Sequence, residues 1–158
     1  KFLRGRLFMD GGKALARLRF KMRLDFVAES KSARLFFGNK GSVEQAEELR
    51  EQKVSLLRNI PVQGIIIEQI DMDHEIYTII DEYSNKLSYY APVYILFSAD
   101  SLENALRFTM KEEFRTIEML DPEQITLSQM ETVRLVQNVN DELLNFKRVL
   151  ERRIENWK

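Results

Sequence analysis

The segment from Arg17 to Phe26 alternates between polar and apolar side chains at every step, and this pattern constrains the fold more than any other feature. One series is apolar and consists of Leu18, Phe20, Met22, Leu24 and Phe26; the other is basic except at its end and consists of Arg17, Arg19, Lys21, Arg23 and Asp25. Successive side chains of a strand point to opposite faces, so the segment is predicted to form a strand with one buried face.

A turn motif precedes this segment. Two apolar-polar segments, Phe2–Met9 and Lys13–Phe26, flank the sequence Asp10-Gly11-Gly12. Glycine adopts the positive φ angles that tight hairpin turns require. We therefore expect an N-terminal β-hairpin whose second strand contains the alternating segment.

Helix caps, prolines and apolar runs predict the elements that follow. Ser42 and Gln45 have the spacing of a capping box for a helix over about residues 43–59, which Pro61 ends. Asp100 and Glu103 have a similar spacing and predict a second helix over about residues 101–114. Further strands are predicted at Ile65–Ile67, Glu75–Asp81, Lys86–Phe97 and Arg115–Leu120, and Pro92 is expected to mark a bulge or an edge position.

This order of elements favours an α+β fold in which an antiparallel sheet carries its helices on one face. A ferredoxin-like βαββαβ core is the simplest such arrangement, preceded here by the hairpin and followed by a long C-terminal helix. No internal repeat and no linker divides the sequence, so residues 1–158 are expected to form a single domain.

Residues 128–157 are predicted to form the long C-terminal helix, which begins with a capping box of Ser128 and Glu131. It would extend roughly 42 Å at 1.5 Å per residue, which exceeds the width of a small sheet. Part of its apolar stripe is therefore expected to pack against a second copy of the chain. The residues expected to mediate this self-association are Val139, Leu143, Phe146, Leu150, Ile154 and Trp157. The alternative is that the helix lies across the sheet of its own chain.

The basic series of the first strand is a candidate nucleic-acid-binding surface. Arg17, Arg19, Lys21 and Arg23 would project from one face at ~7 Å intervals and could match the phosphates of a single strand. The aromatic residues of this strand, Phe20 and Phe26, lie on the opposite face, where they could not stack on bases. The alternative is a solvated face paired with acidic residues, namely Glu68, Asp71, Asp73 and Glu75.

A glycine-rich turn is a second candidate site. Gly38, Asn39, Lys40, Gly41 and Ser42 lie between an apolar segment and a helix N-terminus, where backbone N–H groups could bind a small anion. The turn lacks the spacing of a P-loop, and an ordinary turn with a helix cap also explains it. The only histidine, His74, lies among Asp71, Asp73 and Glu75, and a polar turn or an exposed strand accounts for that cluster.

Composition limits the functional classes. The net charge of −1 gives no general attraction to nucleic acids or anionic membranes. Cysteine is absent, which excludes disulfides, thiolate metal sites and cysteine nucleophiles and suits a reducing, cytoplasmic location. No apolar run approaches the ~20 residues of a membrane-spanning helix. No signal peptide is visible, and the first residue, Lys1, leaves an upstream segment open.

No motif indicates a catalytic residue, a metal or a cofactor. The sequence therefore favours a non-enzymatic binding or regulatory protein that self-associates partly through its C-terminal helix, as a homodimer or with another protein as partner. A domain that binds single-stranded nucleic acid through the basic strand face is the first alternative. An enzyme that acts on a small anionic substrate at the glycine-rich turn is the second.

Overall fold

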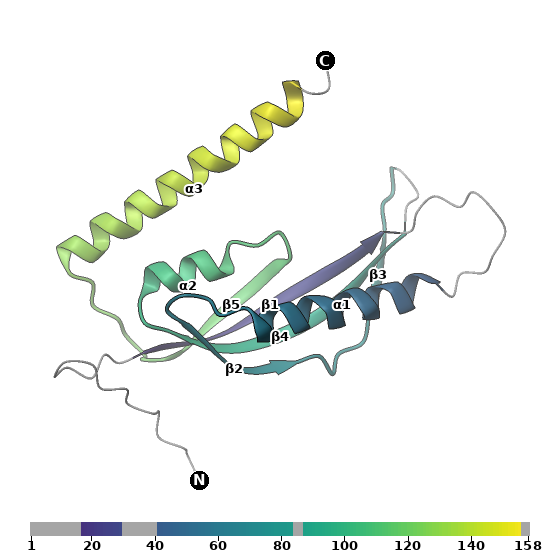
Figure 1. Cartoon of the computed structure of the whole chain (residues 1–158), viewed down its shortest axis with the longest axis horizontal. Coiled ribbons are helices and arrows are strands. Elements are labelled where there is room, and N and C mark those ends of the chain that lie inside the picture. The colour runs from purple at the N-terminus through teal and green to yellow at the C-terminus, as the bar shows by residue number, and fades with distance from the viewer. Residues whose placement is uncertain (1–16, 30–40, 84–86, 156–158) are drawn as a thin grey trace, which may run out of the picture. The chain divides into compact units, whose positions relative to one another are not determined.

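The computed structural model describes residues 17–29, 41–83 and 87–155, and the chain divides into two compact units, residues 1–123 and 124–158 (Figure 1). The first unit, called the body below, contains β1 (Leu18–Glu29), α1 (Gly41–Asn59), β2 (Ile65–Asp71), β3 (Tyr77–Ile80), β4 (Leu87–Ala99), α2 (Leu102–Thr109) and β5 (Phe114–Asp121). The second unit contains α3 (Gln129–Glu155). None of the helices in the described residues has the length and hydropathy needed to cross a membrane.

The body is built on an antiparallel sheet of five strands in the order β2-β4-β1-β5, with β3 also paired to β4. The predicted α+β class, with an antiparallel sheet and a long C-terminal helix, is confirmed. The ferredoxin-like strand order is not confirmed, because the edge beside β4 consists of two separate strands. The predicted N-terminal hairpin lies outside the described residues, apart from its second strand, which forms β1 from Leu18 onward.

The core lies between the sheet and the two helices of the body. The apolar series of β1 is buried as predicted, and β4 adds the alternating residues Val93, Ile95, Phe97 and Ala99. Val54 of α1 and both Ala105 and Phe108 of α2 pack against these strands, so the two helices cover the same sheet face. The ring of Phe97 stacks on Phe20 at 5.4 Å and meets the ring of Phe108 edge-on at 4.8 Å.

Helix α2 is shorter than predicted, and both its N-cap and its last residue differ from the predicted ones. Ser101, and not Asp100, is the N-cap, and its side chain accepts a hydrogen bond from the backbone N–H of Asn104. The helix ends at Thr109, four residues after the buried Ala105. Phe114 starts β5 instead of ending the helix, since it pairs with Leu24 and packs on the core.

Pro92 occupies a central strand, whereas a bulge or an edge position was expected. On one side it pairs with Asp25 of β1. On the other side β2 pairs with β4 only as far as Tyr94, and β3 pairs from Tyr90 onward, which leaves residues 91–93 without a partner strand there. Proline has no N–H to donate, so a central strand tolerates it where the neighbouring strand is interrupted.

The side chain of Arg50 fills the gap beside Pro92. It is 6% exposed, and its Nη1 donates to the carbonyl oxygens of His74 (2.8 Å) and Pro92 (3.3 Å). Its Nη2 forms an ion pair with Glu47, one turn earlier on α1. This residue of α1 therefore replaces the missing strand as the hydrogen-bond partner of Pro92, and it also bonds a carbonyl of the segment that connects β2 to β3.

We expect Arg50→Met to lower the free energy of unfolding by about 2 kcal/mol, since it leaves two shielded carbonyl groups without a donor. The matched variant Arg58→Met, at an exposed position of the same helix, should change the stability by less than about 0.5 kcal/mol. Urea denaturation followed by circular dichroism measures both values. Equal effects of the two substitutions would show that Arg50 does not hold the interrupted edge.

The capping box predicted for the C-terminal helix is present. The backbone N–H of Glu131 donates to Ser128 Oγ (3.2 Å), and the backbone N–H of Ser128 donates to Glu131 Oε2 (2.7 Å). These hydrogen bonds with Ser128 lower the pKa of Glu131 below its usual value of 4.5. The helix is described to Glu155, and Trp157 lies outside the described residues.

A lowered pKa in the folded state means that Glu131 stabilises α3 above its usual pKa, and that this contribution is lost as the pH falls through the lowered value. We therefore expect acidification from neutral pH to reduce the helical circular-dichroism signal less in Glu131→Ala than in the original chain. Glu123→Ala, at an exposed position before the helix, is the control and should leave the titration unchanged. Identical acid titrations of all three chains would contradict a role for the capping box.

Candidate functional site

The sheet face opposite α1 and α2 is the first candidate surface. We call it the polar sheet face, and it carries Arg19, Lys21, Arg23 and Asp25 of β1, Tyr77 of β3, Tyr90 and Tyr94 of β4, and Thr116 and Glu118 of β5. These positions alternate with the core positions of the same strands. Among the described residues of the body, no helix packs on this face.

Each cation of the basic series has a partner in the structure. Arg17 donates to the carbonyl oxygen of Gly64 (2.9 Å) and to Ser98 Oγ (3.2 Å). Arg19 binds both carboxylate oxygens of Glu68 at 2.6–3.1 Å, and these hydrogen bonds raise the pKa of Arg19. Lys21 Nζ lies 5.1 Å from the ring centroid of Tyr94. The basic series is therefore partly neutralised by its own surroundings.

Only Glu68, among the four acids expected to pair with the basic series, forms such an ion pair within the described residues. Asp71 instead accepts a hydrogen bond from the backbone N–H of Asp73 (2.9 Å), which lowers the pKa of Asp71. His74 Nε2 lies 3.4 Å from Asp71 Oδ2, between β2 and β3. The described residues contain no group of carboxylates and histidines suited to hold a metal ion.

Asp25 forms the centre of a buried cluster that the sequence did not predict. Its side chain is 1% exposed and accepts hydrogen bonds from Arg23 (2.7 and 3.1 Å) and from the hydroxyl of Tyr77 (2.6 Å). Arg115 Nε lies 3.3 Å from the same carboxylate. Burial, and then the hydrogen bond to Asp25, raise the pKa of Tyr77. The hydrogen bond to Asp25 raises the pKa of Arg23.

A bulge in β5 places Arg115 beside this cluster. Arg23 pairs with Thr116 and Leu24 pairs with Phe114, so Arg115 is the extra residue between them. Its guanidinium also lies 5.7 Å from the ring centroid of Tyr90. The bulge thus brings a second arginine within ion-pair distance of the buried carboxylate of Asp25.

The presence of three tyrosines on the polar sheet face was not predicted from the sequence. The rings of Tyr77 and Tyr90 stack at 5.1 Å, and Tyr94 lies within 6 Å of both Lys21 and Arg23. Phe20 and Phe26 of β1 do lie on the opposite face, in the core, but the neighbouring strands β3 and β4 add aromatic rings to the polar sheet face. The apolar alternation from Ala91 to Ala99 was the available signal, since it puts residues 90 and 94 on the other face.

Most of the glycine-rich turn lies outside the described residues. Gly38, Asn39 and Lys40 lie outside the described residues, while Gly41 and Ser42 are the first residues of α1, which begins two residues earlier than predicted. An anion site there stays a prediction. A separate cavity of about 320 Å³ is mainly apolar and is lined by Leu24, Phe26, Lys53, Leu56, Leu57, Ile60, Val62, Lys111 and Glu113.

Helix α3 is the second candidate surface. Five of the residues expected to mediate self-association lie on it: Val139, Leu143, Phe146, Leu150 and Ile154. Their exposed fractions run from 37% for Val139 to 62% for Leu143 and Ile154, and α3 has no buried residue. Residues 124–158 contain no second described helix or strand that could cover this apolar face.

Comparison with known proteins gives no match to any protein family model, to any curated protein or to any solved structure.

Proposed function

We propose that the chain is a non-enzymatic binding or regulatory protein that self-associates through α3. The observation that carries this proposal is the apolar face of α3, which extends over a 27-residue helix in a unit with no other described element. A helix usually needs tertiary packing of its apolar face to be stable in water. Apolar faces of this extent are typical of interaction sites.

The partner is a second copy of the same chain. The apolar residues Val136, Val139, Leu143, Phe146 and Leu150 are spaced alternately by three and four residues, which is the repeat of helices that pack side by side. The apolar face is widened by Val133, Leu144, Val149 and Ile154. A face of this width buries more area in a helix pair than a strict two-position seam does.

The body would be the part of each copy that binds or regulates. We propose that it has a ferredoxin-like arrangement in which β2 and β3 act as one interrupted edge strand, since they pair with successive parts of β4. Counted in this way, β4 lies between β1 and β2, and β1 lies between β4 and β5. Each β-α-β unit is then split by a strand of the other, as in a βαββαβ fold. The cytoplasmic location expected from the cysteine-free composition is part of the same proposal.

The solution mass of the full chain tests self-association. Light scattering over a wide range of protein concentrations should give twice the chain mass of 18.7 kDa at high concentration and a decline towards the monomer on dilution. A mass of 18.7 kDa at every concentration would contradict the proposal.

Binding of single-stranded nucleic acid by the polar sheet face is the second candidate function. The specific observation in its favour is Tyr94, whose ring shares this face with Lys21 and Arg23. Basic side chains beside exposed aromatic rings allow phosphate contacts and base stacking together. The ion pairs of Arg19 and Arg23 weaken this candidate, because a nucleic acid would have to compete with Glu68 and Asp25.

Fluorescence anisotropy with a labelled oligouridine at low salt tests this second function. Binding should weaken as salt increases, and Tyr94→Ala should weaken it roughly tenfold, since stacking on an aromatic ring contributes about 1–3 kcal/mol per base. Lys53→Ala, on the helix-covered side, is the control and should bind like the original chain. A flat anisotropy at low salt would eliminate nucleic acid as the ligand.

A further inference from the structure

The distribution of charge along α3 is uneven between its two halves. From Gln129 to Glu142 the helix carries three carboxylates and one arginine, for a net charge of −2: Glu131, Asp141, Glu142 and Arg134. From Leu143 to Glu155 it carries four basic and two acidic residues, for a net charge of +2: Lys147, Arg148, Arg152, Arg153, Glu151 and Glu155. The acidic half of one helix is thus attracted to the basic half of a second helix, whereas two acidic halves or two basic halves repel each other.

The size of the apolar side chains changes in the same direction. Within the apolar face defined above, the acidic half contributes the valines at 133, 136 and 139, whereas the basic half contributes Leu143, Leu144, Phe146, Leu150 and Ile154 together with one valine, Val149. Side chains pack without voids when large residues of one surface meet small residues of the other. Pairing the small end of one helix with the large end of another therefore fills the interface more evenly than pairing like ends.

From these two gradients we infer that the copies pair through α3 in antiparallel orientation, an inference that rests on the proposed self-association. Alignment of Leu143 with Phe146 of the second copy then places Val139 level with Leu150 and Val136 level with Arg153. Each acidic half lies along a basic half, and the helix dipoles oppose each other, which is also favourable.

The parallel orientation gains one weak ion pair but also brings two like charges together. It would bring Glu142 close to Lys147 of the second copy, but a single exposed ion pair contributes little. It would also place Arg153, which continues the repeat after Leu150, against Arg153 of the second copy. Two like charges at such a position oppose association, so the antiparallel arrangement is the more stable.

The orientation determines how far apart the two bodies are attached. Each body is joined to the N-terminal end of α3. In the register given above, an antiparallel pair separates the two copies of residue 129 by 31 residues along the axis, or about 47 Å, whereas a parallel pair brings them side by side. The assembly would thus present two attachment points that are far apart and related by a two-fold axis.

Distances between spin labels test the orientation directly, because the chain has no cysteine and single-cysteine variants can be labelled without background. We expect Gln129→Cys to give a distance of about 47 Å within the dimer, and Glu155→Cys to give about 30 Å. A mixture of the two labelled chains should give a much shorter distance, since residue 129 of one copy then lies near residue 155 of the other.

The solution mass of the same samples separates the two proposals. A dimer in which each single variant gives a distance below about 20 Å, close to the spacing of packed helices, would overturn the antiparallel orientation and leave self-association intact. A monomeric mass in all samples would overturn both.

Discussion

Replacing Asp25 with alanine is expected to lower the free energy of unfolding of the chain by about 3 kcal/mol, because removal of one partner from a buried ion pair leaves its cations uncompensated. The carboxylate is 1% exposed and is shared by Arg23, Arg115 and the hydroxyl of Tyr77. The side chains of the two arginines are 29% and 36% exposed, so water compensates part of the loss. The expected loss of unfolding free energy is therefore at the lower end of the range measured when one partner of a buried ion pair is removed.

Glu118→Ala is the matched control for this prediction, since Glu118 is an exposed carboxylate on the neighbouring strand. It should change the stability by less than about 0.5 kcal/mol. Urea denaturation of both variants and of the original chain measures the difference. A loss below about 1 kcal/mol in Asp25→Ala would mean that this cluster contributes no more to stability than an exposed ion pair does.

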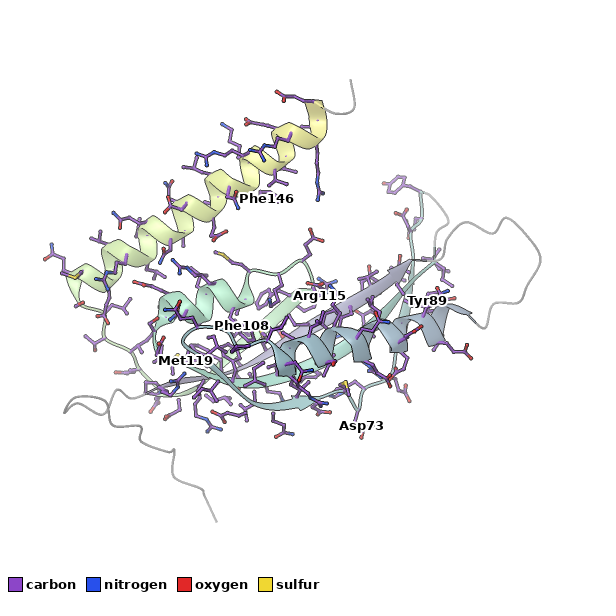
Figure 2. The ribbon with its side chains drawn as sticks, viewed as in Figure 1. Asp73, Tyr89, Phe108, Arg115, Met119 and Phe146 are labelled. Atoms are coloured by element: carbon purple, nitrogen blue, oxygen red, sulfur yellow. The ribbon has the colours of Figure 1, made fainter. Side chains whose placement is uncertain are left out.

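Substitution of Phe146 by glutamate is expected to weaken self-association by roughly 1000-fold. Loss of a large apolar side chain from the centre of an interface costs about 2 kcal/mol or more, and a dimer loses it twice. At 1.4 kcal/mol per tenfold change, about 4 kcal/mol corresponds to the stated factor. Phe146 projects from the apolar face of α3 and is 61% exposed in the single chain (Figure 2).

Asn145→Glu is the control for this substitution, because it introduces the same charge one residue away, outside the three-four repeat of the apolar face. Sedimentation velocity over a concentration series gives the dissociation constant of each variant. Equal weakening by the two substitutions would show that the added charge, and not the lost apolar contact, is responsible.

Elements whose signals are local could be predicted from the sequence. The alternation of Leu18–Phe26 specifies both the strand and its buried face, since each side chain's direction depends only on its own position. The start of α3 could be predicted for the same reason, because Ser128 and Glu131 are within one helical turn of each other.

Features that depend on the pairing of distant segments could not be predicted. Pro92 looked like an edge residue because the interruption of its neighbouring strand, and the arginine that fills it from α1, are set by tertiary structure. The Asp25 cluster combines residues of β1, β3 and β5, and the bulge that adds Arg115 depends on strand register. For α3 the signals are local again, and the sequence could specify both its apolar face and the uneven charge along it.

Hydrogen–deuterium exchange at two protein concentrations tests most directly whether α3 is the element of assembly. If it is, amides of residues 129–155 should exchange slowly at the high concentration and faster at the low one, while amides of the buried strands β1 and β4 remain protected at both. If exchange in α3 is the same at both concentrations, the helix does not mediate association and the proposed function is wrong.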